Sequence, residues 1–160
     1  ESIEIKWHPT RPKEASKEAL EVNGYNDYNW RGAIDIRQGL RQIEQFLVRH
    51  SDAVCVGHNL YFDKKFIEAF GKEHGCDLRI PTPYLDTRDI CRATLAPYGL
   101  HSMRLDEICA FLGWKRRRAH SALSDCEDCA KIIQCLVPPS HKFILRLQIQ
   151  RQLRRIRGLL

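Results

Sequence analysis

Apolar and polar residues alternate in some parts of the chain and recur at helical spacing in others, so the pattern predicts its elements. Residues 2–7 alternate strictly, which predicts a strand. Residues 53–57 form a short apolar run closed by glycine, typical of a buried parallel strand. Residues 84–85 predict a further short strand directly before a helix.

Other stretches place apolar side chains three or four residues apart, as on one face of a helix. The clearest is the stretch that carries Ile36, Leu40, Ile43 and Leu47. Strands that alternate with helices predict an α/β domain. We assign residues 1–137 to that domain and 138–160 to a basic amphipathic C-terminal helix. The predicted helices are 13–25, 33–50, 61–75, one that begins near 87, 103–114, 121–136 and the tail from 145.

Composition fits a single soluble domain of 160 residues, with 43% hydrophobic and 29% charged residues. No apolar run approaches the roughly 18 residues that a membrane span needs. The first ten residues lack the basic and apolar regions of a signal peptide. The seven cysteines are scattered through apolar patterns, as reduced core thiols are, so we expect a cytoplasmic protein without a membrane partner. Cys126 and Cys129 have metal-ligand spacing but lack a second pair.

The net charge of +6 comes from the tail, because residues 138–160 contain basic side chains and no acidic ones. A basic tail suggests nucleic acid, and the amphipathic stripe suggests a polymerase or another protein partner. A solvated helix face is the simpler alternative. A second basic run, Lys115, Arg116, Arg117 and Arg118, is a candidate phosphate contact.

Two places in the pattern carry candidate catalytic side chains. Asp63 lies in the first turn of a helix, just after the strand end Gly57-His58-Asn59, where α/β sheets bind ligands. His120 and Asp125 lie five residues apart where another helix begins, so both can face one cavity. Each aspartate has a plainer explanation, since helix starts favour acidic residues.

Both places lie in longer motifs. Asp63 ends the run His58-Asn59-Leu60-Tyr61-Phe62-Asp63, and Asp125 ends the run His120-Ser121-Ala122-Leu123-Ser124-Asp125. In this order they resemble the second and third motifs of the DEDDh 3′–5′ exonucleases, a family that includes the proofreading epsilon subunit of bacterial DNA polymerase III. The segments LDTRDICRAT and RLDEICAFLGW are also similar to that family, and the resemblance covers residues 1–137.

The resemblance implies a ribonuclease-H-like mixed sheet flanked by helices. It also implies four carboxylates that hold two divalent ions, Mg²⁺ or Mn²⁺, during phosphodiester hydrolysis. Asp63 and Asp125 would be two of those metal ligands, and His120 would be the general base, because imidazole titrates near neutrality.

The implied substrate is a nucleic acid with a free 3′ end, with single-stranded DNA expected before RNA. His58 and Asn59, together with the run 115–118, are the expected nucleic-acid contacts.

One motif of the family is missing. Its first motif is a D-x-E on the first strand, and the one D-x-E here, Asp125-Cys126-Glu127, belongs to the third-motif helix. We therefore expect the sheet to lack its first two strands, which leaves strand 53–56 with an open edge. The chain would then be an N-terminally truncated, incomplete or inactive exonuclease. A degenerate homologue, or one that borrows a strand from a second copy, is the other explanation.

Two other functions stay open from the sequence alone. One is a non-catalytic nucleic-acid-binding module that uses the run 115–118 and the basic tail. The other is a small metal-binding or interaction domain built on Cys126 and Cys129.

Overall fold

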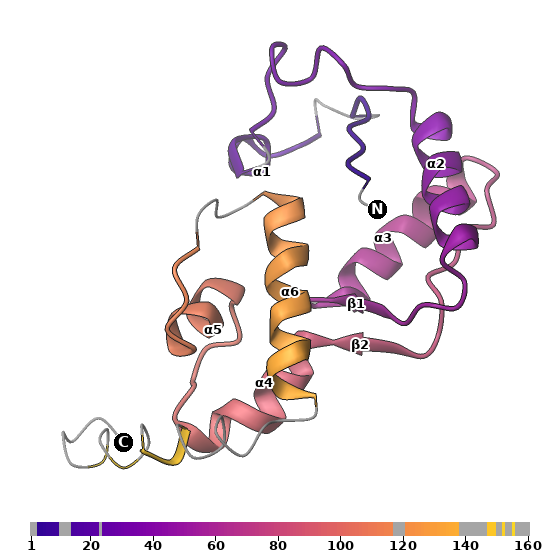
Figure 1. The fold of residues 1–160 in the computed structure, drawn as a ribbon. Coiled ribbons are helices and arrows are strands. Elements are labelled where there is room, and N and C mark those ends of the chain that lie inside the picture. Colours follow the sequence, from indigo (N-terminus) through magenta and orange to yellow (C-terminus); the bar gives the residue numbers. More distant parts are fainter. Residues whose placement is uncertain are drawn as a thin grey trace. The chain divides into compact units, whose positions relative to one another are not determined.

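The computed structural model describes residues 3–9, 14–22, 24–116, 121–137 and 147–149, together with Gln152 and Arg155. Contacts divide the chain into two units. The first comprises 1–55 and 61–83, and the second comprises 56–60 and 84–160. Figure 1 shows the elements in chain order.

The regular elements in the described part of the first unit are chiefly helices, as the spacing predicts. Its helices are α1 (Lys17–Val22), α2 (Ile36–Arg49) and, from its second residue, α3 (Leu60–Glu73). Helix α2 begins after Asp35, whose side chain accepts a hydrogen bond from the Arg37 backbone N–H at 2.9 Å. Such a cap satisfies an N–H that has no partner inside the helix.

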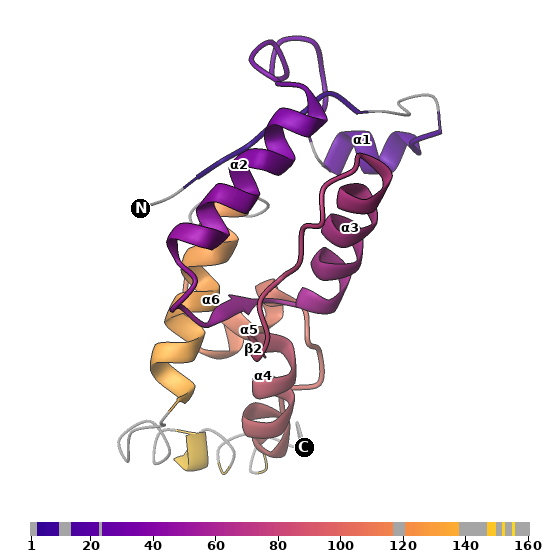
Figure 2. The ribbon, with the colours of Figure 1, turned by 90° about the vertical axis from the view of Figure 1, so that its right-hand side faces the viewer.

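The core of this unit lies between α2 and α3. Ile36, Leu40 and Leu78 are buried, and Ile67 and Phe70 of α3 pack against them. Figure 2 shows the chain after α3 running back between the two helices, which brings Leu78 into this core.

The predicted strand over residues 2–7 is wrong for the residues that the structure describes. Trp7 forms one isolated parallel bridge with Ile34, and residues 3–6 form no strand. The alternating pattern predicts extended backbone, but a ladder also needs a neighbouring strand along its whole length. The segment packs on α2 instead: a Cβ on Gly39 would lie 2.9 Å from Trp7 Cε3, so glycine permits this approach.

The second unit is built around a small parallel sheet, and the two strands predicted at 53–57 and 84–85 are confirmed. Within the described residues the sheet has the order β1 (Cys55–Gly57) and β2 (Tyr84–Asp86), and Figure 1 shows the two arrows side by side. The helices that follow, also as predicted, are α4 (Thr87–Leu95), α5 (Leu105–Phe111) and α6 (Ala122–Leu136). The 3-10 turn η1 (Ala96–Tyr98) directly after α4 was not predicted.

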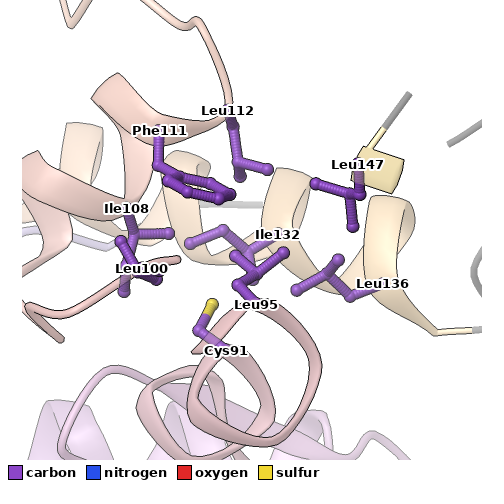
Figure 3. Close-up of a cluster of buried hydrophobic side chains, with 9 residues drawn as sticks. All are labelled: Cys91, Leu95, Leu100, Ile108, Phe111, Leu112, Ile132, Leu136 and Leu147. Carbon is purple, nitrogen blue, oxygen red and sulfur yellow. The ribbon is translucent and has the colours of Figure 1, made fainter. Parts of the chain in front are cut away.

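Side chains from α4, α5 and α6 converge in the core of the second unit (Figure 3). Leu95, Ile108 and Ile132, one from each helix, are completely buried. Leu147 from the tail is also buried in this cluster. Most of the tail lies outside the described residues, so the boundary at 137–138 stays a prediction.

The α/β fold class is confirmed, since helices accompany a parallel two-stranded sheet in the described residues. In the part of the chain that the structure describes, no helix combines the length and the apolar character that crossing a membrane requires.

All seven cysteines are free thiols, and three of them are buried in the second unit. Burial raises the pKa of Cys91 to about 12, and it raises the pKa of Cys109 and of Cys129 to about 11. These thiols therefore stay protonated and unreactive near neutral pH, as packing residues do.

The buried thiols predict that stability falls in alkali. The unfolded thiols ionise near pH 8.5–9 and the folded ones only near 11–12, so unfolding releases protons between these limits and the free energy of unfolding falls as pH rises. Each such thiol contributes a slope of about 1.4 kcal/mol per pH unit. Urea unfolding across pH 9–11 should show a shallower slope for Cys91→Ala, while Cys126→Ala, at an exposed position, leaves it unchanged. Equal slopes for wild type and Cys91→Ala would contradict the burial effect.

Helix α6 offers a matched test of the core. Leu136 is 2% exposed and Leu123 is 45% exposed, and both lie in the same helix. Leu136→Ala should lower the free energy of unfolding by about 2–5 kcal/mol because it leaves a cavity. Leu123→Ala should cost about 1 kcal/mol or less. Denaturant midpoints measure both, and equal losses would show that α6 does not pack through Leu136.

Candidate active site

The carboxylate of Asp86 joins the ends of both strands to the helices that follow them. Asp86 Oδ1 accepts hydrogen bonds from the backbone N–H groups of Asn59 at 3.0 Å and Arg88 at 2.9 Å. Its Oδ2 accepts one from the N–H of Leu60 at 2.8 Å. Asn59 has a φ of 63°, a left-handed conformation that asparagine tolerates better than most residues. Asp86 thus caps α4 and also holds the turn that leads into α3.

His58 is held inside the fold by both ring nitrogens. Its Nε2 lies 2.8 Å from the carbonyl oxygen of Met103, and its Nδ1 lies 3.0 Å from Thr87 Oγ1. A carbonyl only accepts, so Nε2 carries the hydrogen in the bond to Met103. Thr87 is completely buried, and its Oγ1 also lies 2.9 Å from the carbonyl oxygen of Gly57. His58 therefore ties the end of β1 to α4 and to the segment before α5.

An open pocket of about 390 Å³ lies beyond the carboxyl ends of β1 and β2, within the second unit. Ligands bind at this edge in α/β sheets. Arg88 Nη1 donates a hydrogen bond to Asn59 Oδ1 at 2.9 Å across one wall. The polar side chains that line the pocket are His58, Asn59, Arg88, Arg104, Asp106, Arg116 and Asp125.

Arg116 makes ion pairs with three aspartates around this pocket. Its Nη1 donates to Asp106 Oδ1 of α5, and its Nη2 donates to Asp125 Oδ1 of α6. Its Nε donates to Asp128 Oδ2 at 2.8 Å. Lys131 adds a second cation, 3.3 Å from Asp128 Oδ1. One guanidinium thus joins α5 to the first two turns of α6.

Burial and charge oppose each other at Arg116. The side chain is 9% exposed, and this burial alone would lower the pKa of the guanidinium. The hydrogen bonds with Asp106 and Asp128 and the charge of Asp125 outweigh burial and raise that pKa. Arg116 is therefore a permanent cation next to Asp125.

The structure brings four of the predicted site residues to one pocket, namely His58, Asn59, Arg116 and Asp125. Asp63 lies in the first turn of α3, in the first unit. Lys115 is exposed, next to Arg116 in the chain. The remaining predicted site residues, Arg117, Arg118 and His120, lie outside the described residues.

Four residues of this region were missed from the sequence: Asp86, Thr87, Asp106 and Asp128. Asp86 had a signal, because an aspartate at a strand-to-helix junction is a typical N-cap. Thr87 had no local signal, because its contact with His58 joins residues 29 positions apart in the sequence. Asp128 lies one helical turn after Asp125 and so shares its face, but its pairing with Arg116 has no local signal.

The described side chains do not by themselves form a divalent-metal site. No three histidine, cysteine, aspartate or glutamate side chains of the described residues lie close enough together to hold a metal ion. Asp125 carries the right donor type, since Mg²⁺ prefers carboxylate oxygens. Its Oδ1, however, is paired with Arg116, so a metal ion at that oxygen would have to displace the guanidinium.

Cys126 and Cys129 do not face one environment. Cys126 is exposed, whereas Cys129 is 5% exposed and its Sγ lies 3.8 Å from Thr87 Oγ1. A zinc site needs four ligands around one point. The arrangement thus favours packing over metal binding for this pair.

Comparison with known proteins finds related sequences along most of the chain. A family model described as Exonuclease matches residues 1–133. Ribonuclease T of Vibrio vulnificus strain YJ016 is 32% identical over 142 residues, which covers 82% of this chain and 64% of that protein. Ribonuclease T of Vibrio vulnificus strain CMCP6 is 35% identical over 127 residues, with coverage of 72% and 57%. Ribonuclease T of Vibrio campbellii is 32% identical over 142 residues, with coverage of 82% and 64%. The chain thus spans less than two thirds of the length of these relatives.

The three bonds to Asp86 predict a large loss of stability when its carboxylate is removed. Asp86→Ala leaves three backbone N–H groups without this acceptor and should lower the free energy of unfolding by about 3 kcal/mol or more. Asp86→Asn keeps one acceptor oxygen and should lose less. Asp35→Ala, which removes a cap with one bond, should cost about 1 kcal/mol. Urea unfolding compares them, and equal losses at Asp86 and Asp35 would refute the role given to the three bonds.

Proposed function

Because this chain belongs to the exonuclease family, we propose that it carries the second and third motifs of a metal-dependent 3′–5′ exonuclease. The reaction is hydrolysis of the phosphodiester bond at the 3′ end of a nucleic acid. Asp63 and Asp125 are the proposed metal-site carboxylates, and His120 is the proposed general base.

One observation supports this function most strongly. Asp125 and the second-motif residues His58 and Asn59, which come from distant parts of the sequence, line one pocket beyond the carboxyl ends of β1 and β2. An α/β enzyme places its reactive groups at that edge of the sheet.

His120 suits the proposed role by its chemistry. An unperturbed imidazole has a pKa near neutrality, so a histidine can take a proton from a water that attacks phosphorus. It precedes Asp125 by five residues, which is the spacing of the third motif that the sequence resembles. Asp125 lies in the first turn of α6, and His120 lies outside the described residues.

Two divalent ions, Mg²⁺ or Mn²⁺, are proposed for the complete site. The described residues alone do not form it, because Asp125 is paired with Arg116 and no D-x-E strand motif occurs in the sequence. The carboxylates of the first motif are needed to complete the set of four. We accordingly expect the chain by itself to be a weak or inactive nuclease.

Single-stranded nucleic acid is the proposed substrate. The relatives are named ribonucleases, that is, enzymes that cleave RNA. We propose RNA as the substrate of this chain as well, with single-stranded DNA as the alternative. Lys115 is exposed and suits phosphate contact, whereas Arg116 is turned inward. The basic tail is proposed to contact a protein partner or the nucleic acid, in a cytoplasm that keeps the free thiols reduced.

A shortening assay with 5′-labelled strands tests the proposal. The chain, preceded by a first-motif D-x-E segment of the exonuclease family, should remove nucleotides stepwise from the 3′ end of RNA in Mg²⁺. The chain alone should be at least about 100-fold slower, the scale on which a lost catalytic group acts. In the joined protein, His120→Ala should lose about 10²–10⁴-fold, and Asp125→Asn should lose activity as well.

Asp89→Asn is the matched control, because Asp89 is an exposed aspartate of α4 that pairs with Arg92. It should leave the rate unchanged. Cleavage inside the strand, cleavage without a divalent ion, or full activity of Asp125→Asn would each contradict the proposed function. DNA strands of the same sequence decide between the two substrates.

A further inference from the structure

Arg116 pairs with Asp125, so a cation of the chain itself interacts with the carboxylate that is proposed to bind a divalent ion. Asp125 Oδ1 accepts from Arg116 Nη2, so one of the two carboxylate oxygens that a metal ion could bind is already paired. Asp125 is still 39% exposed toward solvent, so ions can reach it. The guanidinium is 9% exposed and cannot be neutralised at any ordinary pH.

We infer that Arg116 competes with divalent cations for the Asp125 carboxylate. This competition keeps the affinity of the third motif for divalent cations low. This inference rests on the proposed function, because it takes Asp125 as a metal ligand. A cation near a carboxylate disfavours a second cation through repulsion and through the bond that must break. Metal binding at Asp125 therefore includes the cost of repulsion from Arg116 and, at Oδ1, the cost of displacing it.

The neighbouring aspartates explain why Arg116 stays in place. Asp128 is 8% exposed and pairs with Arg116 Nε at 2.8 Å, while Asp106 of α5 pairs with Nη1. A buried carboxylate needs such a partner, because leaving a buried charge unpaired is strongly unfavourable. Arg116 can thus release Asp125 while it keeps Asp106 and Asp128.

A plain clamp would behave differently from a competitor. If Arg116 only joined α5 to α6, every substitution that loses the guanidinium would loosen the site and weaken metal binding. If Arg116 competes, the result depends on charge: a substitution that keeps the positive charge keeps metal binding weak, and a neutral one strengthens it. Arg116→Lys and Arg116→Gln separate these cases. Both variants lose the guanidinium that pairs with three aspartates, but only Arg116→Lys keeps the positive charge.

Titration of Mn²⁺ into the 160-residue chain, followed by electron paramagnetic resonance of the free ion, measures the competition without any activity. Arg116→Gln should bind Mn²⁺ about tenfold more tightly than wild type, the effect of one unit charge about 5 Å from a divalent ion in water-like surroundings. Arg116→Lys should stay close to wild type. Arg92→Gln, which removes an exposed cation of α4, should change nothing.

A second pair of variants controls for the possibility that Arg116→Gln alone does not fold. Arg116→Gln together with Asp128→Asn removes the cation and the buried carboxylate it neutralises. This double variant should bind Mn²⁺ more tightly than Asp128→Asn alone, in which Arg116 still pairs with Asp125. Circular dichroism confirms that each variant is folded.

The outcomes for this inference and for the proposed function are distinct. If Asp125→Asn abolishes binding but Arg116→Gln does not strengthen it, the competition is refuted and the metal role of Asp125 stands. If Asp125→Asn leaves binding unchanged, the metal role of Asp125 fails, and the inference fails with it. Absence of Mn²⁺ binding in every variant, Arg116→Gln included, also refutes the competition. Tighter binding in Arg116→Gln that Asp125→Asn removes supports both.

Discussion

The arrangement of the candidate site depends on one carboxylate, that of Asp86. It stands at the end of β2 and accepts backbone hydrogen bonds from Asn59, Leu60 and Arg88. These three N–H groups start two helices, α3 and α4, and helix starts otherwise leave such groups without partners. A single side chain therefore fixes how the chain leaves both strands of the sheet. Asn59 holds its left-handed turn within this arrangement, and the wall that it forms with Arg88 follows from it.

The helices could be predicted from sequence because their pattern is local. Helix α2 has a capping aspartate at its start and apolar side chains on one face, and both signals lie inside the same segment. The strand predicted at residues 2–7 failed for the opposite reason. Its alternation was correct as a pattern, but a strand is defined by its neighbour, and Trp7 meets a partner at Ile34 alone. Short strands such as β1 were found because glycine and a following helix marked their ends.

The candidate site was only partly predictable. Asp125 and the second motif could be found because their residues and spacing resemble the motifs of a known family, which are visible in the sequence itself. The inward position of Arg116 could not be found in the same way. Its sequence context is a run of four basic residues, which is typical of a solvated phosphate contact. The burial of Arg116 arises from aspartates of α5 and α6, and one-dimensional pattern does not tell which member of a basic run turns inward.

The charges around Arg116 explain why some cation is required at this place. Asp106, Asp125 and Asp128 lie within reach of one guanidinium, and Lys131 supplies one further positive charge. Without a cation between them, three carboxylates on α5 and α6 would repel one another in a partly desolvated setting, where such repulsion is stronger than in water. Arg116 meets this requirement from within the chain. A divalent ion on Asp125 would bring twice the charge to the same region, so the two cations are alternatives at that carboxylate for electrostatic reasons alone.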